Sequence, residues 1–369
     1  MAVNKRKGVP RLKKGATLAD IAAAVGVSSS TVSMILSGKN NARFSPDTVR
    51  EVQQAACRLG YTKRNRVIPQ GDGRMILVIC PSIANPYYTT LIQGIEQATH
   101  AGGYTTVLMT TYWDTNAEKR IINSVHSYHV AGVIFAMVPQ LTDLAEKLSK
   151  TVPVVAVGDR NNDLDLATAD VNNFQSGVLV AEHLISLGHR HIAYISTPLN
   201  EDHSARVRRL EGLRETFADR CPNGTITVRM RSVTPDEELA QIDLEHDVGF
   251  ELTKSCLSNK KITAFVAIND MVAYGVMDAL IDAGYSIPQD YSVCGFDNIF
   301  PSHLAPVALT SVDHSIASRG QAAFRLLLDK MNEKPAFGAD SITRVEYQSR
   351  LVVRGSTAVP SAEKLQGAD

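Results

Sequence analysis

Hydroxyl-bearing side chains are concentrated near the N-terminus, in residues 28–34. Ser28 is a residue type that caps helices, and the apolar residues after it recur at helical spacing. On such a helix the exposed face carries three hydroxyls and one apolar thioether, from Ser29, Ser30, Ser33 and Met34. A face of this kind, made of groups that donate or accept hydrogen bonds, is suited to the base edges in the major groove of DNA.

A second predicted helix precedes this one. Residues 16–38 read ATLADIAAAVGVSSSTVSMILSG, a pattern of two short helices joined by a tight turn at Gly26. Thr17 and Asp20 have the spacing of a capping box. Two helices joined in this way place the second where it can enter the major groove. Any two-helix hairpin gives a similar pattern, so the pattern alone leaves DNA contact and simple packing as equal alternatives.

The first 74 residues of the chain are basic and the rest of the chain is acidic. Residues 1–74 hold 14 Lys or Arg and four acids, a formal charge of +10, and the neutral whole leaves −10 for the remainder. A basic segment suits a polyanion, because neutralising phosphates supplies most of the non-specific affinity for DNA. The basic residues at 5–14 fit a solubilising tail as well as a DNA-binding arm.

A third short helix and a large remainder follow. Ser45-Pro46-Asp47 predicts a capped helix that ends at Gly60. The 369 residues suffice for two or three domains, and no apolar run reaches membrane-spanning length. The basic N-terminus lacks the apolar core of a signal peptide. The scattered cysteines favour a reducing cytoplasm; they are Cys57, Cys80, Cys221, Cys256 and Cys294.

After Arg74, short apolar runs alternate with helical stretches. Strands are predicted at 75–80, 105–109, 132–137, 152–157, 191–196, 262–268 and 291–296. Helices are predicted at about 87–101, 115–128, 174–187, 203–218, 246–258, 270–283 and 315–331. Continuous apolar strands separated by helices indicate parallel sheets with both faces covered. One series begins at Met75 and another at His191, which predicts two α/β lobes with a cleft between them.

Ligands of open α/β sheets bind beyond the carboxyl ends of the strands. That rule selects a set of aromatic, amide, carboxylate and guanidinium side chains: Tyr87, Tyr88, Trp113, Asp159, Arg209, Asn269, Asp270 and Asp297. Aromatic rings stack on a ligand's apolar face while the polar groups bind hydroxyls or ring nitrogens. Alternatives stay open for four of them. Asp270 fits a helix cap before Met271, and Trp113, Tyr87 and Tyr88 fit core packing.

The chain resembles the lactose/galactose repressor family of bacterial transcription regulators along nearly its whole length. Residues 16–38 carry the resemblance together with seven further segments in the family's order. These are RLGY (58–61), NPYYTTLIQGIEQATHAGGY (85–104), HLISLGHRHIAYI (183–195), RRLEG (208–212), AFVAINDMVAYGVMDAL (264–280), SIPQDYSVCGFDN (286–298) and SRLVVRGS (349–356). The resemblance implies a three-helix helix-turn-helix domain, and a two-lobed α/β domain similar to periplasmic sugar-binding proteins.

The resemblance also implies partners and residue roles. It implies a homodimer, a roughly palindromic DNA operator and a small-molecule effector in the cleft, without a cofactor or metal. Ser29, Ser30 and Met34 occupy base-facing positions, and Ser28 and Thr31 phosphate-contacting ones. Thr17, Ser33 and Arg43 complete the predicted DNA contacts in this domain. The cleft positions of the family match Tyr87, Tyr88, Arg209, Asn269, Asp270 and Asp297.

Three positions depart from the family's pattern. Met34 stands where Arg or His is frequent and can touch only apolar base surface, such as a thymine methyl. The linker 63–73 lacks the leucine wedge and contains Pro69 and two glycines, which argue against a long helix; Val67 or Ile68 could replace the wedge. His203 replaces an arginine expected of purine-responsive relatives, so a sugar is favoured over a nucleobase.

The predicted domains are a basic tail at 1–15, a helix-turn-helix domain at 16–62 and a linker at 63–74. An effector-binding and dimerisation domain follows at 75–356, and a tail at 357–369. Its lobes are predicted at about 75–171 with 299–330, and 172–298 with 331–356. The tail lacks leucine heptads, which predicts a dimer rather than a tetramer. The sequence leaves the sign of regulation open.

Two other classes of function compete with a regulator. A solute-binding protein without DNA function lacks a reason for the basic N-terminal helices. An α/β enzyme acting on a sugar-like ligand lacks a P-loop, a Gly-x-Ser-x-Gly and a Gly-x-Gly-x-x-Gly after a strand. His183, His189 and His191 span a predicted helix-to-strand junction, a poor spacing for a metal site. The sequence therefore predicts an allosterically controlled transcription regulator, a repressor by the family's commoner behaviour, and no enzyme.

Overall fold

The computed structural model describes residues 17–36, 44–59, 74–159, 164–200, 204–304, 308–332 and 341–361. The chain divides into two compact units, Met1–Pro69 and Gln70–Asp369, which are considered separately below. No single helix among the described residues is long and apolar enough to cross a membrane. The helices Leu18–Val25 and Ser29–Leu36 meet such a criterion only as a pair bent by 105°.

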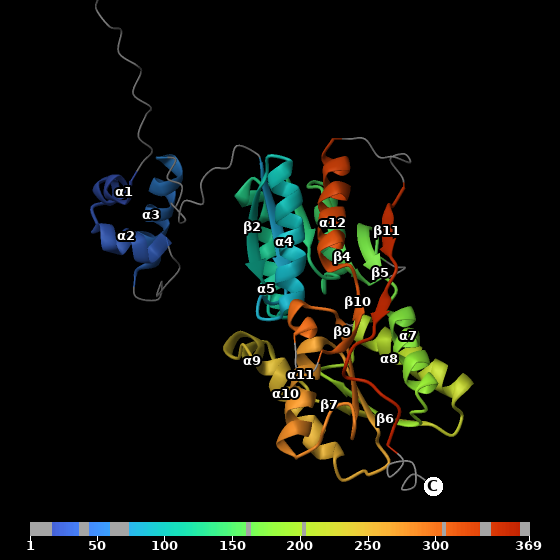
Figure 1. Ribbon diagram of the computed structural model, residues 1–369. Helices are drawn as coiled ribbons and strands as arrows, with labels where there is room; N and C mark the ends of the chain where they lie inside the picture. The colour runs from blue at the N-terminus through green and yellow to red at the C-terminus, as the bar shows by residue number, and fades with distance from the viewer. Residues whose placement is uncertain are drawn as a thin grey trace, which may run out of the picture. The chain divides into compact units, whose positions relative to one another are not determined.

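The first unit contains three helices, α1 (Leu18–Val25), α2 (Ser29–Leu36) and α3 (Pro46–Arg58) (Figure 1). The predicted capping box is present: the Thr17 N–H donates to Asp20 Oδ2 at 2.7 Å, and the Asp20 N–H donates to Thr17 Oγ1 at 3.3 Å. Gly26 ends α1 with a left-handed φ of 75°, a conformation that costs glycine little. The chain turns there into α2.

The core of the first unit is small and entirely apolar. It consists of Ile21, Ala22, Val32, Ile35, Val52, Ala55 and Ala56, drawn from all three helices. Leu59, directly after α3, is 39% exposed and lies outside this core. Because Val32 and Ile35 point inward, the opposite face of α2 is left exposed.

The second unit is built on two six-stranded sheets, each of which forms one lobe. In the first lobe the strand order is β11-β5-β4-β3-β1-β2. The strands are β1 (Met75–Cys80), β2 (Thr105–Thr110), β3 (Gly132–Phe135), β4 (Val154–Asp159), β5 (Ala167–Val171) and β11 (Arg344–Tyr347). Its helices are α4 (Pro86–Ala101), α5 (Thr115–Ser124), η2 (Val125–Tyr128), α6 (Thr142–Ser149) and α12 (Ile316–Met331).

The second lobe repeats this plan with the order β12-β10-β9-β8-β6-β7. The strands are β6 (His191–Ser196), β7 (Thr225–Met230), β8 (Ala264–Ala267), β9 (Ser292–Asp297), β10 (Thr310–Asp313) and β12 (Arg350–Val352). Its helices are α7 (Asn173–Ser186), α8 (Ser204–Arg220), α9 (Pro235–Ala240), α10 (Leu244–Cys256), α11 (Asp270–Asp282) and η4 (Phe300–His303). Within each sheet the paired strands are parallel, except that β12 runs antiparallel to β10.

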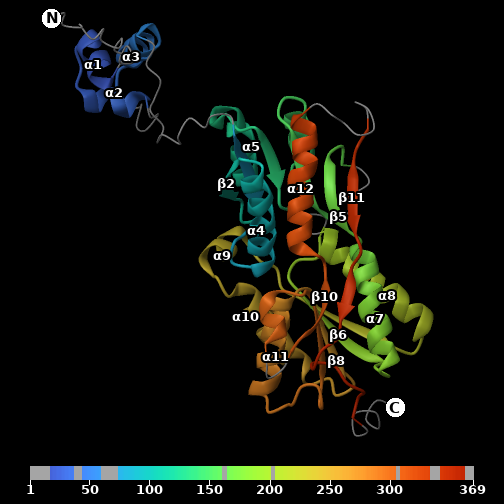
Figure 2. The same cartoon turned by 45° about the horizontal axis from the view of Figure 1, so that its top comes forward.

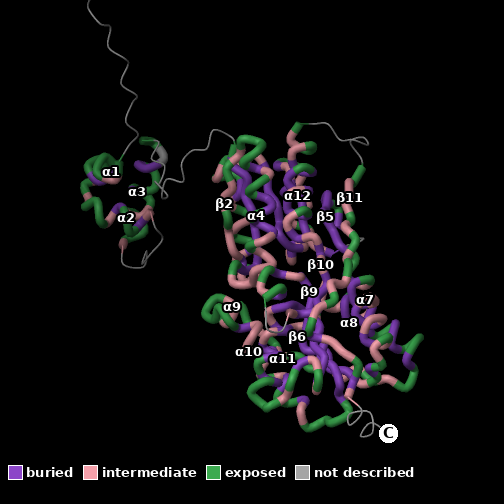
Figure 3. Tube along the Cα trace, in the orientation of Figure 1, coloured by how far each residue is buried: buried purple, intermediate pink, exposed green. Residues whose placement is uncertain are grey.

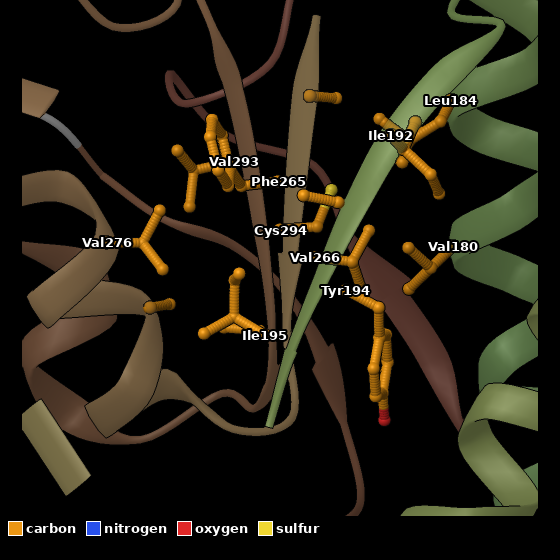
Figure 4. Packing of buried hydrophobic residues seen from close by; sticks show 14 of the residues in the cluster. Val180, Leu184, Ile192, Tyr194, Ile195, Phe265, Val266, Val276, Val293 and Cys294 are labelled. Carbon is orange, nitrogen blue, oxygen red and sulfur yellow. The ribbon is translucent and has the colours of Figure 1, made fainter. Parts of the chain in front are cut away.

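Helices cover both faces of each sheet, and the strands between them are buried, as the purple tube of the central strands shows (Figure 3). In the second lobe Val180 and Leu184 of α7 pack on one face, and Val276 of α11 packs on the other (Figure 4). The continuous apolar strands thus lie where the sequence predicted them. The edge strands β2 and β7 are only partly buried.

The predicted lobe boundaries are wrong for two strands. The range 299–330 was assigned to the first lobe, but β10 pairs with β9 in the second sheet. The range 331–356 was assigned to the second lobe, but β11 pairs with β5 in the first. Strands β5, β7, β10, β11 and β12 and helices α6 and α9 were not predicted, because their short or polar sequences lack a continuous apolar run.

The chain passes between the lobes at three places, which we call the crossovers. They are residue 172 between β5 and α7, residues 314–315 between β10 and α12, and residues 348–349 between β11 and β12. Figures 1 and 2 show these segments side by side where the two lobes meet. Any relative movement of the lobes has to bend the chain there.

Helices α7 and α8 approach each other closely at two glycines. A Cβ on Gly177 would lie 2.0 Å from the Arg209 carbonyl oxygen, and one on Gly212 would lie 2.0 Å from that of Phe174. At an exposed position inside a helix, a Gly→Ala substitution stabilises the protein by about 1 kcal/mol. Here we predict that Gly177→Ala destabilises the protein by about 1–3 kcal/mol, because the helices must separate. Urea denaturation measures this change.

The matched control is Gly355→Ala, where the nearest atom to a new Cβ lies at 3.8 Å. We expect it to change the free energy of unfolding by less than about 0.5 kcal/mol. A Gly177→Ala protein as stable as the wild type would contradict the close approach of the two helices.

Candidate functional site

The first candidate surface is the exposed face of α2. Ser28 caps the helix, since its Oγ accepts the Thr31 N–H at 3.1 Å and also lies 2.9 Å from Thr31 Oγ1. Ser29, Ser30, Ser33 and Met34 are exposed, and Met34 is 41% exposed despite its apolar side chain. The face therefore combines hydroxyls with one apolar group, as the sequence predicted.

Other predicted DNA contacts have different placements. The Thr17 hydroxyl donates to Asp20 Oδ2 at 2.7 Å and so belongs to the helix cap. Arg43, Val67 and Ile68 lie outside the described residues, as does the basic tail.

The second candidate site is a cleft between the two lobes with about 1060 Å³ of empty space, part of it open to solvent. Seven of the eight predicted ligand-binding residues line it. The first lobe supplies Tyr87, Tyr88, Trp113 and Asp159, and the second lobe supplies Arg209, Asn269 and Asp297. The carboxyl ends of the strands thus face each other across the cleft, as expected for this class of sheet.

Arg209 lies at the base of the cleft with only 8% of its surface exposed. Its Nε donates to Asn173 Oδ1 at 2.8 Å, and its Nη1 donates to the Ile268 carbonyl at 2.6 Å. Nη2 lies 3.5 Å from Asp297 Oδ1. The guanidinium also stacks 4.8 Å from the centre of the Phe296 ring. These contacts fix its orientation and compensate its burial.

Asp297 is held in an unusual backbone conformation at the end of β9. Its φ is 105°, a region that costs a non-glycine residue about 1–3 kcal/mol. Its Oδ1 lies 3.3 Å from His314 Nδ1, and burial together with the neighbouring Arg209 charge lowers the pKa of His314 to about 4. The imidazole is therefore neutral near pH 7.

Asp297 and Arg209 connect the cleft to the crossovers. His314 belongs to one crossover, and its Nε2 lies 3.3 Å from Ser176 Oγ. Ser176 in turn donates to Ser349 Oγ of another crossover at 2.8 Å. Asn173, bonded to Arg209, begins α7 directly after the third. One hydrogen-bonded network thus reaches from the cleft to all three crossovers.

The aromatic residues of the first lobe are held by ring packing and by a hydrogen bond from a buried arginine. Tyr87 and Tyr88 pack edge to face with ring centres 5.0 Å apart. Arg319, which is 2% exposed, donates to the Tyr87 hydroxyl at 3.0 Å and to the Gly158 carbonyl at 2.8 Å. Across the cleft, the Arg206 guanidinium lies 5.8 Å from the centre of the Trp113 ring.

Asp270 does not reach the cleft, which corrects its prediction as a ligand contact. It is fully buried and accepts hydrogen bonds from the Ile299 N–H at 3.0 Å and from the hydroxyls of Ser302 and Ser311 at 2.5 Å each. The alternative that it caps a helix is also wrong by one residue. The cap is Asn269, whose Oδ1 accepts the Val272 N–H at 2.9 Å.

The segment after β7 contributes cleft residues that the sequence did not reveal. These are Glu238 of α9 and Glu245 of α10; Arg206 of α8 and Asn85 at the start of α4 also line the cleft. Glu245 accepts hydrogen bonds from Asn85 Nδ2 at 2.6 Å and from Asn269 Nδ2 at 2.8 Å. Had β7 been predicted, the strand-end rule would have pointed to this segment.

Both glutamates are harder to ionise than free ones. Burial, followed by the charge of Glu245, raises the pKa of Glu238 to about 7. Burial also raises the pKa of Glu245, opposed by the charge of Arg206. The cleft is therefore an environment in which negative charge is disfavoured.

The three histidines of the HLISLGHRHIAYI segment lie apart from this cleft. His189 bonds Thr263 Oγ1 at 2.8 Å and Ser292 Oγ at 3.0 Å, while His183 bonds Thr357 and His191 bonds Thr225. Each ring is paired with hydroxyls of other segments.

Comparison with known proteins gives the family. Residues 17–64 match the model for bacterial regulatory proteins of the lacI family, and residues 181–357 match a periplasmic binding protein-like domain. The HTH-type transcriptional regulator MalR of Streptomyces coelicolor is 31% identical over 353 residues, covering 94% of this chain and 98% of that protein. The chain belongs to the lacI family.

Other relatives of this lacI-family chain extend the comparison. The transcriptional repressor PurR of Mannheimia succiniciproducens is 28% identical, covering 92% of this chain and 98% of that protein. A structure of the transcriptional regulator CelR in complex with cellobiose is 25% identical with a TM-score of 0.64, covering 92% of this chain and 99% of that one. The chain is thus a DNA-binding transcription regulator with a small-molecule effector, not an enzyme, and the predicted cytoplasmic location agrees with that role.

The buried role of Asp270 gives a stability prediction. Asp270→Ala leaves up to three buried donors without their acceptor, so we expect a loss of about 2–4 kcal/mol in the free energy of unfolding. Asp282→Ala on the same helix removes only an exposed ion pair with Lys254 and should cost less than about 0.5 kcal/mol. Equal stabilities in urea denaturation would contradict this account.

The raised pKa of Glu238 gives a pH prediction. The pKa of Glu238 is ordinarily 4.5 and about 7 in the folded protein. Its favourable contribution to the free energy of unfolding is therefore complete below pH 4.5 and is lost as the pH rises through 7. Glu238→Gln removes this loss. We expect the melting temperature of the variant, relative to that of the wild type, to increase as the pH rises from 5 to 8. A difference independent of pH would show that Glu238 ionises normally.

Proposed function

We propose that the chain is a homodimeric repressor whose affinity for a pseudopalindromic operator is set by a sugar-like effector in the interlobe cleft. The observation that supports this most is the hydrogen-bonded network from Arg209 and Asp297 to the three crossovers. A ligand that pairs with these side chains acts directly on the segments that bend when the lobes move. Two copies of the first unit on one operator require a two-fold arrangement of half-sites.

The face of α2 supports base recognition by short side chains. Hydroxyls of Ser29, Ser30 and Ser33 can donate to or accept from base edges, whereas Met34 offers only apolar contact. Basic residues of the first 74 positions supply phosphate contacts that set register without reading sequence. Operator choice therefore rests on few directional contacts.

The operator prediction uses Met34→Arg. An arginine there can form a bidentate contact with guanine, a pairing worth about 1–3 kcal/mol of discrimination. We expect operators selected from random DNA by the variant to gain a guanine in each half-site. Glu51→Ala, on an exposed position of α3, should select the wild-type operator. Identical operators for Met34→Arg and wild type would remove α2 from the reading surface.

A polyhydroxylated effector fits the composition of the cleft. Trp113, Tyr87 and Tyr88 offer aromatic faces, and carboxylates and amides face them from the second lobe. The structure of CelR in complex with cellobiose supports a sugar. His203, the residue that argued against a nucleobase, lies outside the described residues.

The effector prediction is a thermal one. A ligand at about 100 times its dissociation constant adds roughly 2.7 kcal/mol of stability, an upshift of several degrees. We expect one class in a panel of sugars, sugar phosphates, uronic acids and nucleosides to give this shift. Asp297→Ala should abolish the shift, whereas Met34→Arg should retain it. A shift that survives Asp297→Ala would place the ligand elsewhere.

A further inference from the structure

The cleft carries more negative than positive groups. Among its described lining residues, the carboxylates are Asp159, Asp297, Glu238 and Glu245, and the guanidinium groups are Arg206 and Arg209. Arg209 lies beside Asp297, and its Nε and Nη1 donate to Asn173 and to the Ile268 carbonyl. The segment of α9 and α10 therefore presents two carboxylates with Arg206 as the nearby cation.

Glu245, one of these carboxylates, is held in place by the side chains of two asparagines that cap helices. Asn85 begins α4 in the first lobe and Asn269 begins α11 in the second. The Oδ1 of each caps its helix, accepting the N–H of Tyr87 at 2.8 Å and of Val272 at 2.9 Å. This fixes the orientation of both amides, and both Nδ2 groups donate to Glu245, one to each carboxylate oxygen.

Glu245 thus occupies the place where two helix-capping amides could otherwise bind an anionic group of a ligand. A phosphate or carboxylate would have to displace Glu245 from both amides and would also meet Glu238. A hydroxyl or an ammonium group meets carboxylate oxygens that accept its hydrogen bond. The same side chains therefore attract donors and repel anions.

We propose that Glu238 and Glu245 set the specificity of the cleft by excluding ligands that carry a phosphate or carboxylate group. The effector is then an uncharged or cationic polyhydroxylated molecule. This inference rests on the proposed effector function of the cleft and narrows the ligand class within it. Sugar phosphates and uronic acids are excluded, whereas free sugars, glycosides and amino sugars remain.

The charge of the cleft is measurable without knowing the ligand. Ala205 lines the cleft on α8 beside Arg206, so Ala205→Cys places a thiol there. The rates at which the full-length protein reacts with a trimethylammonium-bearing and a sulfonate-bearing methanethiosulfonate are compared, after subtraction of the parent's own rates. Four native thiols, of Cys80, Cys221, Cys256 and Cys294, are buried.

At a pH above 7, where the Glu238 carboxyl is ionised, we expect the cationic reagent to react faster. We expect Glu245→Gln to lower the ratio of the two rates by about three- to tenfold, the effect of one nearby charge. Glu238→Gln should lower it in the same direction, which keeps the test open if Glu245→Gln fails to fold. Glu251→Gln removes an exposed charge from α10 outside the cleft and should leave the ratio unchanged. Equal rates, or a ratio insensitive to both cleft variants, would overturn the proposal.

A ligand measurement completes the test. Melting temperatures are recorded with glucose and glucose 6-phosphate, and with ribose and ribose 5-phosphate. A stabilising phosphorylated sugar would overturn the proposal, while stabilisation by a free sugar and not by its phosphate supports it. The rate ratio could behave as expected while no uncharged sugar or glycoside in a wider panel raises the melting temperature. That result would contradict the proposed sugar-like effector but support the charge selectivity of the cleft.

Discussion

A buried guanidinium needs acceptors around it, and the second unit is arranged so that Arg209 finds them. Asn173 at the start of α7, the Ile268 carbonyl after β8 and Asp297 at the end of β9 converge on one side chain of α8. Leaving such a charge unpaired costs several kcal/mol, so these segments are held together. The glycine contacts between α7 and α8 serve the same arrangement, because they bring Arg209 close enough to Asn173.

This constraint also explains how ligand binding in the cleft could affect segments outside it. His314 and Ser176 extend the Arg209 and Asp297 cluster to the crossovers, where the lobes are joined. A ligand hydroxyl that bonds Asp297 changes the balance among groups that already share hydrogen bonds. Cooperative polar networks of this kind have few equivalent arrangements, which suits a molecule that alternates between two states.

Much of this was readable from the residues. Continuous apolar runs such as MILVIC at β1 predicted the central strands, and the strand-end rule found Arg209, Asn269 and Asp297. The rule failed at Asp270, because two adjacent polar residues at one strand end point in opposite directions, and only the structure shows that Asn269 faces the cleft. It could not find Glu245, since the edge strand β7 alternates and is half exposed. The lobes of β10 and β11 depend on long-range pairing that local patterns do not contain.

In the proposed mechanism the cleft and the DNA-binding face are thermodynamically coupled. The most direct measurement is the affinity of the effector, once found, for the free protein and for the protein saturated with operator. Coupled sites typically change each other's affinity by about 5- to 150-fold, and the change must be reciprocal. We predict that operator alters effector affinity by the same factor by which effector alters operator affinity. Effector affinities that are equal with and without operator would contradict the account.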